Sequence, residues 1–285
     1  MSDDQLHSLA SFLASNSLGA LIVALVCVYS VIELAIWLFH AVAQPAWEFI
    51  RKSPPLGKAT PSRQTKASAG AFLGLHLTVG LCLAALAVRI FGELAEEVVE
   101  KGKLECFDLA FADALHENTT VPQLKFFEGI ACLANVWTLS VLTLVVMAIL
   151  LRRRQFFRAT AWLTALAGGG LLNTLLKNEF HRLRPNLPNP FVTEPGWSFP
   201  SGHAMISVIA YGMLAYLLIT EASNSRARRL IMGAAIFLVV IIGFSRLYLT
   251  VHYFSDVVAG YAAGGFWLLI CISATELASS RRPHG

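Results

Sequence analysis

Residues 199–220 read FPSGHAMISVIAYGMLAYLLIT, in which a short polar turn stands directly before an apolar run. The apolar run approaches the roughly 20 residues that a helix needs to cross a bilayer core about 30 Å thick. The turn consists of Pro200, Ser201, Gly202 and His203, of which the histidine is titratable. Polar residues at the end of a membrane helix indicate a binding site as well as a helix boundary.

The composition indicates a membrane protein. Of the 285 residues, 56% are hydrophobic and 14% are charged, with a mean hydropathy of +0.61, which excludes an ordinary soluble domain. Seven apolar runs have about the length of a membrane span, so we predict an all-α, polytopic membrane bundle with seven spans. The runs extend from Leu18 to His40, Ala69 to Phe91, Ile130 to Leu151, Ala159 to Leu176, Ala204 to Thr220, Leu230 to Leu249 and Val257 to Thr275.

Charge is distributed unevenly between the loops. Lys and Arg collect in the linker 51–66, in 152–158, in 223–229 and in the tail 281–285. Glu and Asp dominate the segment 93–128. Because basic loops tend to stay in the cytoplasm, this asymmetry predicts an external N-terminus and a cytoplasmic C-terminus, as an odd number of spans requires. We expect a bacterial inner membrane protein with a site on its periplasmic face.

The first long external segment, 92–129, contains an amphipathic pattern. Leu104, Phe107, Phe111 and Leu115 are spaced so that one face of a helix would carry all of them. We expect this helix to cap the bundle, with a lipid-gating flap as the alternative.

The second external segment, residues 177–203, is rich in proline and is therefore predicted to be stiff, which suits a site that must keep its shape. Elsewhere, Glu33 and His76 fall inside apolar runs at similar predicted depth, and we expect them to pair.

Basic residues break the charge pattern at the external ends of the last four runs, which favours an anionic ligand there. Lys177 and Arg184 are seven residues apart and would share one face of a helix that continues past Leu176 until Pro185 stops it. They would grip one anion together, or else snorkel to lipid headgroups. His181 and Arg182 fall off that face and are left outside the predicted site. The residues gathered at these ends are Lys177, His181, Arg182, Arg184, His203, Arg246, His252 and Asp256.

The polar turn before Ala204 has the features of a phosphate cradle. A turn directly before a helix exposes backbone N–H groups whose partial positive charge attracts an anion, and Gly202 allows the anion to approach closely. Ser201 belongs to this cradle, although an ordinary N-cap serine is the alternative. His203 is placed to give a proton to a leaving oxygen.

Residues 245–256 read SRLYLTVHYFSD and add a second histidine with a carboxylate four residues later. His252 and Asp256 would stack on one helical face if the last helix starts near Val251. The carboxylate would then fix the tautomer of His252 and leave the other ring nitrogen as a nucleophile. Arg246 lies off that face, so the chain must bend between Arg246 and His252.

These three segments resemble the signature of the type 2 phosphatidic acid phosphatase superfamily, in its membrane-bound branch. The matches are Lys, six residues and Arg-Pro in KNEFHRLRP, the tetrapeptide PSGH, and Ser-Arg, five residues, His, three residues and Asp in SRLYLTVHYFSD. The resemblance covers residues 69–277 and implies a six-helix phosphatase core. Residues 1–68 would add an extra transmembrane helix with a basic linker, and residues 278–285 a cytoplasmic tail.

The resemblance implies that five residues bind phosphate. Lys177, Arg184 and Arg246 would hold the phosphoryl oxygens, assisted by the hydroxyl of Ser201 and the backbone of Gly202. Preplaced cations of this kind favour the transition state, because charge builds on those oxygens as the phosphoryl group moves.

Three further residues would carry the chemistry by the same resemblance. His252 would attack phosphorus to form a phosphohistidine, His203 would protonate the departing oxygen and later activate water, and Asp256 would orient His252. Neither a metal nor a cofactor is implied, and the sequence offers no HExxH, paired acidic or Cys/His motif.

The predicted function is hydrolysis of the phosphate or pyrophosphate ester of a membrane lipid, such as phosphatidate, phosphatidylglycerol phosphate or polyprenyl pyrophosphate. A lipid phosphotransferase on the same scaffold is the alternative, in which a lipid hydroxyl takes the phosphoryl group in place of water. A transporter or catalytically silent relative is a third reading, which the intact His203, His252 and Asp256 argue against. The expected partners are the substrate and membrane lipids, not nucleic acid, and the oligomeric state stays open.

Overall fold

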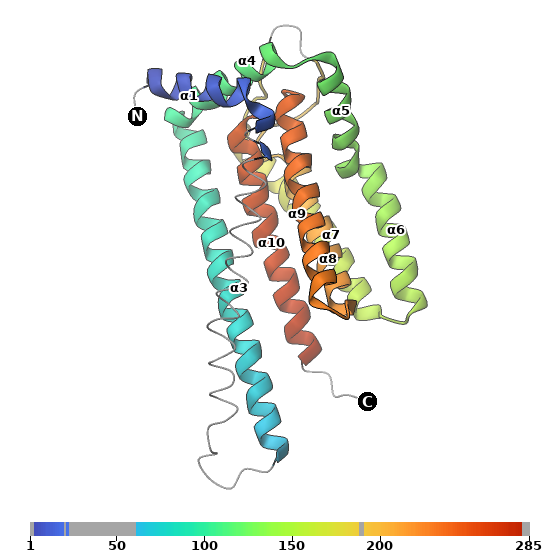
Figure 1. Cartoon of the computed structure of the whole chain (residues 1–285). Helices are drawn as coiled ribbons and strands as arrows, with labels where there is room; N and C mark the ends of the chain where they lie inside the picture. The colour runs from blue at the N-terminus through green and yellow to red at the C-terminus, as the bar shows by residue number, and fades with distance from the viewer. Residues whose placement is uncertain (1–2, 20, 23–60, 188–190, 281–285) are drawn as a thin grey trace.

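The apolar runs form helices (Figure 1), because a helix satisfies its backbone hydrogen bonds internally, as a bilayer core demands. The structure, a computed structural model, describes residues 3–19, 21–22, 61–187 and 191–280, with the backbone alone for residues 3, 61–77 and 280. Five helices in this part of the chain are long and apolar enough to cross a membrane, and a bent pair makes a sixth. The predicted all-α membrane bundle is confirmed. The run 18–40 lies almost entirely outside the described residues, as do Glu33 and the side chain of His76, so the count of seven spans stays a prediction.

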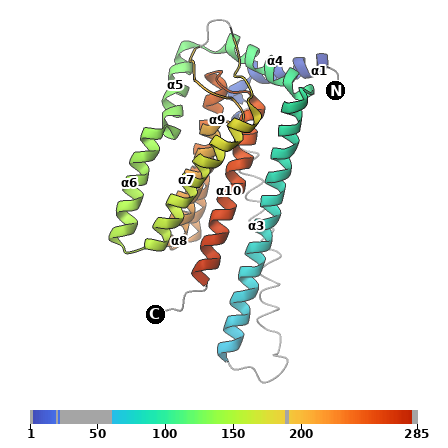
Figure 2. The ribbon, with the colours of Figure 1, turned by 180° about the vertical axis from the view of Figure 1, so that it is seen from behind.

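Each of the last four predicted runs corresponds to one helix, and only Leu249 lies beyond the end of its helix. These helices are α7 (Phe156–Phe180), α8 (Gly202–Glu221), α9 (Ser225–Tyr248) and α10 (Phe254–Ser280). α8 packs against α7, α9 and α10, and the view from behind shows α7 beside α10 (Figure 2). Consecutive helices run in opposite directions, so the end of α7, the start of α8, the end of α9 and the start of α10 meet at one end of the bundle.

Two glycines let α8 and α10 approach closely. A Cβ at Gly260 would lie 2.6 Å from the carbonyl oxygen of Ser201, and a Cβ at Gly264 would lie 2.6 Å from that of Met205. Residues four apart share one face of a helix, so the two glycines form a smooth strip of the kind that lets membrane helices touch. This strip holds the start of α8 directly against α10.

α3 (Pro61–Glu100) contains the second predicted run and continues beyond it. Residues 92–100 are therefore helical and not part of an external loop, which corrects the prediction. Arg89, near the end of the predicted run, forms an ion pair at 2.9 Å with Glu93, one turn further along on the continuation. The hydropathy pattern missed this part because its side chains are charged while its backbone remains helical.

The third predicted run, 130–151, is interrupted by a bend. α5 (Val121–Ala131) and a short 3-10 turn (Cys132–Ala134) lead into α6 (Val136–Arg152) at an angle of 43°. Asn135 has an extended backbone, with φ −67° and ψ 150°, so one helix ends before it and the next begins after it. The predicted single helix is therefore wrong, although the two pieces together have the length of one span.

α4 (Lys103–Asn118) confirms the amphipathic helix predicted within segment 92–129. Phe111 and Leu115 are buried, and Phe107 packs against the same apolar cluster. The helix lies across one end of the bundle (Figure 1), where it acts as a cap in this structure.

α1 (Asp3–Ser15) is a helix that the hydropathy runs did not indicate, because it is short and only moderately apolar. It packs on α4, and its Ala10 and Ala14 are buried. Just beyond it, the hydroxyl groups of Ser17 and Tyr248 lie 2.6 Å apart. The N-terminal segment is thus fixed to the capped end of the bundle (Figure 1).

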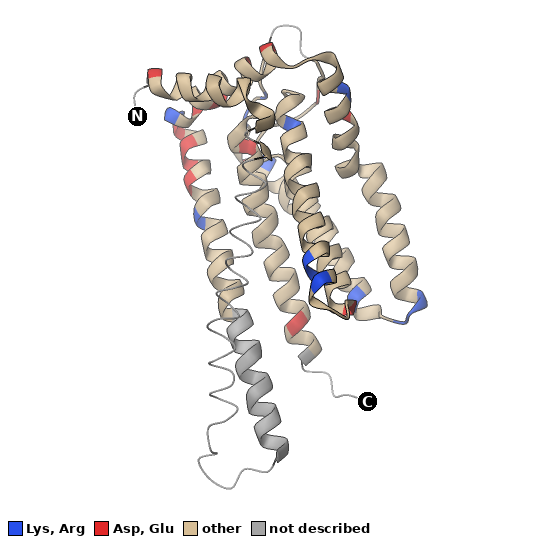
Figure 3. Ribbon diagram, in the orientation of Figure 1, with Lys and Arg blue, Asp and Glu red and all other residues tan. Residues whose placement is uncertain are grey.

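Charge is divided between the two ends of the bundle (Figure 3). Acidic side chains lie at the capped end, on α1 and at the end of α3, whereas basic side chains gather at the opposite end, where α6 leads into α7 and where α9 begins. The basic residues at that opposite end are Arg152, Arg153, Arg154, Arg158, Arg226, Arg228 and Arg229. The asymmetry predicted from the loops therefore separates the two faces of the folded bundle.

Candidate active site

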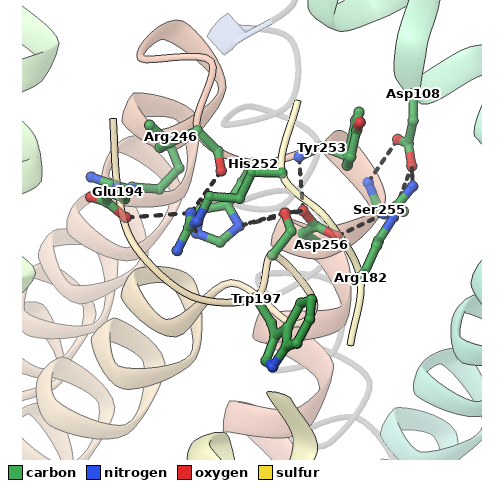
Figure 4. A network of polar contacts seen from close by, with 12 residues as sticks. Asp108, Arg182, Glu194, Trp197, Arg246, His252, Tyr253, Ser255 and Asp256 are labelled. Atoms are coloured by element: carbon green, nitrogen blue, oxygen red, sulfur yellow. Dashed lines mark hydrogen bonds and ion pairs between the residues drawn. The ribbon is translucent and has the colours of Figure 1, made fainter. Parts of the chain in front are cut away.

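Four helix ends bring the predicted site residues together at the capped end of the bundle. Lys177 lies in the last turn of α7, and Gly202 begins α8. Arg246 lies in the last turn of α9, and Asp256 in the first turn of α10. The backbone N–H of Ser201 donates to the carbonyl oxygen of Asp256 at 2.9 Å, which ties the polar turn to α10. Figure 4 shows the network of polar contacts that results.

His252 meets Asp256 across the turn that precedes α10, not along a helical face. α10 begins at Phe254 rather than near Val251, so His252 lies outside the helix, which corrects the prediction. Asp256 Oδ2 accepts a hydrogen bond from the backbone N–H of Tyr253 at 2.9 Å and lies 3.3 Å from His252 Nδ1. A carboxylate in the first turn that binds the backbone N–H before the helix is half of a capping box. The same carboxylate here also holds the histidine.

The chain bends between Arg246 and His252, as predicted. α9 ends at Tyr248, and Thr250 has a left-handed backbone with φ 52°. After this turn both side chains lie in the same network (Figure 4), and each is only 2% exposed. The bend therefore brings Arg246 and His252 to one site, which a continuous helix could not do.

The contacts of the His252 ring define which nitrogen carries its proton. Arg184 Nη1 lies 3.1 Å from Nε2, and a guanidinium can only donate, so Nε2 is the acceptor. The proton therefore sits on Nδ1, which faces Asp256 Oδ2 and Ser198 Oγ at 3.3 Å each. Burial lowers the pKa of His252 to about 4, a shift that Asp256 opposes and two nearby arginines reinforce. The ring is neutral at pH 7 and carries its lone pair on Nε2.

Lys177 and Arg184 reach the site by different routes, which corrects the prediction that both project from one helical face. α7 ends at Phe180, because His181 adopts a left-handed backbone with φ 48°. Arg184 therefore lies in the loop that follows, where its Nη1 donates to the carbonyl oxygen of Val251 at 2.7 Å. Lys177 Nζ donates to two carbonyl oxygens of the same loop. The His181 side chain is exposed and stays outside the site.

A carboxylate that the sequence analysis missed lies between the two predicted phosphate-binding arginines. Glu194 forms an ion pair with Arg246 Nη2 and lies 3.4 Å from Arg184 Nη1. Burial opposes its ionisation, but the charge and hydrogen bond of Arg246, together with the two nearby histidines, outweigh burial and lower the pKa of Glu194. An anion thus already occupies the space between the cations (Figure 4). In the sequence, Glu194 is an isolated acidic residue in a proline-rich loop. It belongs to no motif of fixed spacing, so the sequence analysis could not identify it.

The polar turn contributes groups that lack partners. Ser201 is the N-cap residue of α8, yet its side chain makes no capping hydrogen bond, which argues against the ordinary N-cap alternative. Within the described part of the chain, Ser201 Oγ and Arg246 Nε are buried without a hydrogen-bond partner. Buried polar groups are normally paired, so two unpaired groups at one site indicate room for a polar ligand. Gly202 brings the same turn close to α7, since a Cβ there would lie 3.2 Å from Asn173 Nδ2.

His203 belongs to the same cluster of charges. Its side chain is half-buried in the first turn of α8. It lies within electrostatic range of Arg246, Glu194 and His252. The two histidines, one from the first turn of α8 and one from the turn before α10, therefore share one site at one end of the bundle.

Arg182, which the sequence analysis placed outside the site, is part of the network (Figure 4). Its Nη1 donates to Asp256 Oδ1 and to Ser255 Oγ at 2.7 Å each. Its Nη2 donates to Asp108 Oδ2 on α4 at 2.8 Å. The helical-face argument failed because α7 ends at Phe180, two residues before this arginine.

Comparison with known proteins matches this arrangement to a family. The family model described as PAP2 superfamily matches residues 158–279, a range that includes all of the predicted site residues. Phosphatidylglycerophosphatase B of Bacillus subtilis (strain 168) is 30% identical over 175 residues, which are 55% of this chain and 86% of that protein. The crystal structure of the first transmembrane PAP2 type phosphatidylglycerolphosphate phosphatase from Bacillus subtilis is similar with a TM-score of 0.65 and 25% identity, over 71% of this chain and 98% of that one.

Proposed function

We propose a reaction for this chain, which belongs to the PAP2 superfamily and is a membrane lipid phosphatase. In this reaction His252 is the nucleophile and a phosphohistidine is the intermediate. The observation that carries the proposal is the lone pair on His252 Nε2, directly beside the anion position between Arg184 and Arg246.

The phosphoryl group would take the place that the Glu194 carboxylate occupies. A phosphate monoester carries more negative charge and more acceptor oxygens than a carboxylate, so it competes well for the two arginines. Lys177 and the unpartnered hydroxyl of Ser201 would complete its coordination. Arg184 Nη1 contacts His252 Nε2 in this structure. When Arg184 turns to the phosphate, it frees the lone pair on this nitrogen for attack.

The chemistry proceeds in two displacements. The Nε2 lone pair of His252 forms a bond to phosphorus, the bond from phosphorus to the ester oxygen breaks, and His203 in its protonated form gives that oxygen a proton. The bound phosphate favours the protonated form of His203, because an opposite charge lies nearby. Neutral His203 then takes a proton from water, the oxygen attacks phosphorus, and the bond to nitrogen breaks to release inorganic phosphate. Asp256 keeps the Nδ1 proton of His252 in place throughout.

The substrate is proposed to be a lipid whose acyl chains remain in the bilayer. The site lies at one end of a membrane bundle, so a headgroup can enter while the tails stay in lipid. Phosphatidylglycerol phosphate is the first candidate, because both relatives are named for that reaction. Phosphatidate and polyprenyl pyrophosphate belong to the same class and are tested beside it.

The division of charge supports a proposal for the side of the membrane on which the site lies. Basic residues gather at the end of the bundle opposite to the site, and that end is expected to face the cytoplasm. We therefore place the site on the periplasmic face of a bacterial inner membrane. The catalytic unit is proposed to be the core 69–277, to which residues 1–68 are an addition.

Phosphate release by the full chain in detergent tests the proposal. We expect phosphate from at least one of the three lipids, equally with and without a chelator, and a loss of more than about a thousandfold in kcat for His252→Ala. The matched control is His181→Asn, which changes an exposed histidine and suits its left-handed backbone; it should retain wild-type activity.

Each contrary result has a distinct meaning. Activity that disappears with the chelator would contradict a metal-free mechanism. Full activity in His252→Ala would overturn the assignment of the nucleophile. If a lipid acceptor became phosphorylated and no inorganic phosphate appeared, the phosphotransferase alternative would replace hydrolysis.

A further inference from the structure

Arg182 contacts the carboxylate that orients His252, and it does so from the side away from the phosphate position. Its Nη1 lies 2.7 Å from Asp256 Oδ1, whereas the other carboxylate oxygen faces the histidine. The guanidinium stands over the Tyr253 ring, with its central carbon 4.2 Å from the ring centre, and the side chain is 12% exposed. The arginine is therefore held on several sides.

Asp256 is fully buried, and both of its oxygens are engaged. Oδ2 accepts hydrogen bonds from Ser198 Oγ and from the backbone N–H of Tyr253, and it faces His252 Nδ1. Oδ1 accepts from Arg182. Among the described side chains, Arg182 is the permanently charged partner of this carboxylate. A buried carboxylate that loses its cation carries an uncompensated charge. It is then expected to reorient toward other hydrogen-bond donors.

A second buried carboxylate, that of Asp108, binds the other terminal nitrogen of Arg182, Nη2. Asp108, on the capping helix α4, accepts from Arg182 Nη2 at 2.8 Å and is fully buried. The other oxygen of Asp108 accepts from the backbone N–H of Ser255 at 3.0 Å, and the Ser255 hydroxyl also bonds to this carboxylate. Arg182 thus bridges two helices, and one of its two carboxylates belongs to the site (Figure 4).

We propose that Arg182 is a positioning residue of the phosphatase, which acts through Asp256 to hold His252 with its proton on Nδ1 and its lone pair on Nε2. The inference rests on the proposed function. With one oxygen tied to the guanidinium, the carboxylate cannot rotate away from the histidine. Without that contact the carboxylate turns more freely, the ring is oriented less well, and a larger share of His252 carries its proton on the nitrogen that must attack.

Steady-state kinetics of full-length variants test this role. For Arg182→Gln we expect kcat to fall by about tenfold to a hundredfold, while the inhibition constant for inorganic phosphate, the reaction product, stays within about twofold because the phosphate-binding residues are intact. Arg182→Lys keeps the charge and should recover part of the loss. The matched control is Arg158→Gln, which breaks the ion pair with Glu221 at the opposite end of the bundle and should retain wild-type kcat.

A double-mutant cycle separates positioning from general structural support. If Arg182 acts through Asp256, adding Arg182→Gln to Asp256→Asn should cost less than about twofold, measured by release of radiolabelled phosphate. If the loss in kcat of the double variant equalled the product of the two single losses, Arg182 would act independently of Asp256, and the inference would be overturned. A weaker affinity for inorganic phosphate in Arg182→Gln, with no recovery in Arg182→Lys, would show general disruption of the site and would overturn it as well.

The results also distinguish this inference from the proposed function. If wild type is active, His252→Ala is inactive and Arg182→Gln matches wild type, then the inference alone fails. If His252→Ala keeps full activity, the proposed function fails first.

Discussion

At the scale of single residues, the reactivity of His252 depends on charges of opposite sign. Asp256 favours the protonated ring, while burial and the arginines favour the neutral one, and the balance leaves a pKa of about 4. A neutral imidazole is the form that can attack phosphorus. The same arginines that would bind phosphate therefore also favour the neutral form of His252, the proposed nucleophile.

Because Arg184 lowers the pKa of His252, its removal should change how the activity depends on pH. Activity is lost as the pH falls through the pKa of His252, because protonation removes the lone pair. Arg184 lowers that pKa, so Arg184→Gln should raise it toward the ordinary value of 6.5 and move the acid limb of the kcat/KM profile to higher pH. Titration of the substrate phosphate affects both enzymes equally, so the difference between the profiles reports on the protein. An acid limb that stays in place or moves to lower pH would contradict the assignment.

At the scale of helices, the site depends on how closely α8 approaches α10. The polar turn is tied to α10 by the hydrogen bond from Ser201 to Asp256, and this contact requires the smooth glycine strip below it. A methyl group at Gly264 would meet a backbone carbonyl oxygen, which cannot move aside as a flexible side chain can. The two motif segments therefore depend on glycines that carry no chemistry themselves.

Adjacent glycines provide a matched pair for testing this dependence. Gly264→Ala should destabilise the protein by about 1–3 kcal/mol through overpacking and should lower kcat as α8 shifts away from α10. Gly265→Ala is the control, since a Cβ there meets nothing within 4 Å and Ala favours a helix. Thermal unfolding and phosphate release are measured for both variants. Equal stability of the two variants would contradict the close-packing argument.

At the scale of the whole molecule, charge separates the two ends of the bundle. The site lies at the end where α1 and α4 form a cap, and the arginine-rich turns lie at the other end (Figure 3). The arginines of the site do not follow this division, because they are buried or half-buried and face carboxylates rather than solvent. This contrast explains why a few basic residues at this end of the apolar runs stood out in the sequence.

The orientation is tested by labelling single cysteines from outside. The five native residues, Cys27, Cys82, Cys106, Cys132 and Cys271, are first changed to Ala. Glu117→Cys on α4 and Arg226→Cys at the start of α9 then place one exposed thiol at each end. With a membrane-impermeant maleimide on spheroplasts, we expect Glu117→Cys to react and Arg226→Cys to react only after lysis. The reverse labelling would place the site in the cytoplasm.

Much of the fold was predictable, because its signals are local. Five of the predicted runs correspond to single helices, α3 and α7 to α10, with only Leu249 beyond the end of its helix, since apolar composition acts on each segment independently. The bend at Asn135 and the extension of α3 to Glu100 were missed, because backbone conformation there does not follow hydropathy. The spacing of the three motifs indicated both histidines and all three cations that are proposed to bind phosphate, and the structure brings these residues to one end of the bundle.

The sequence by itself determined the membrane bundle, the division of charge and the motif residues, because each is set by composition or by spacing within a short segment. Only the tertiary structure decided that Glu194 lies between two arginines and that Arg182 bridges Asp108 and Asp256. These partners are up to 148 residues apart in the chain, counted from Asp108 to Asp256. Where a side chain points depends on where its helix ends and on which helices pack around it, and no local pattern of residues encodes either.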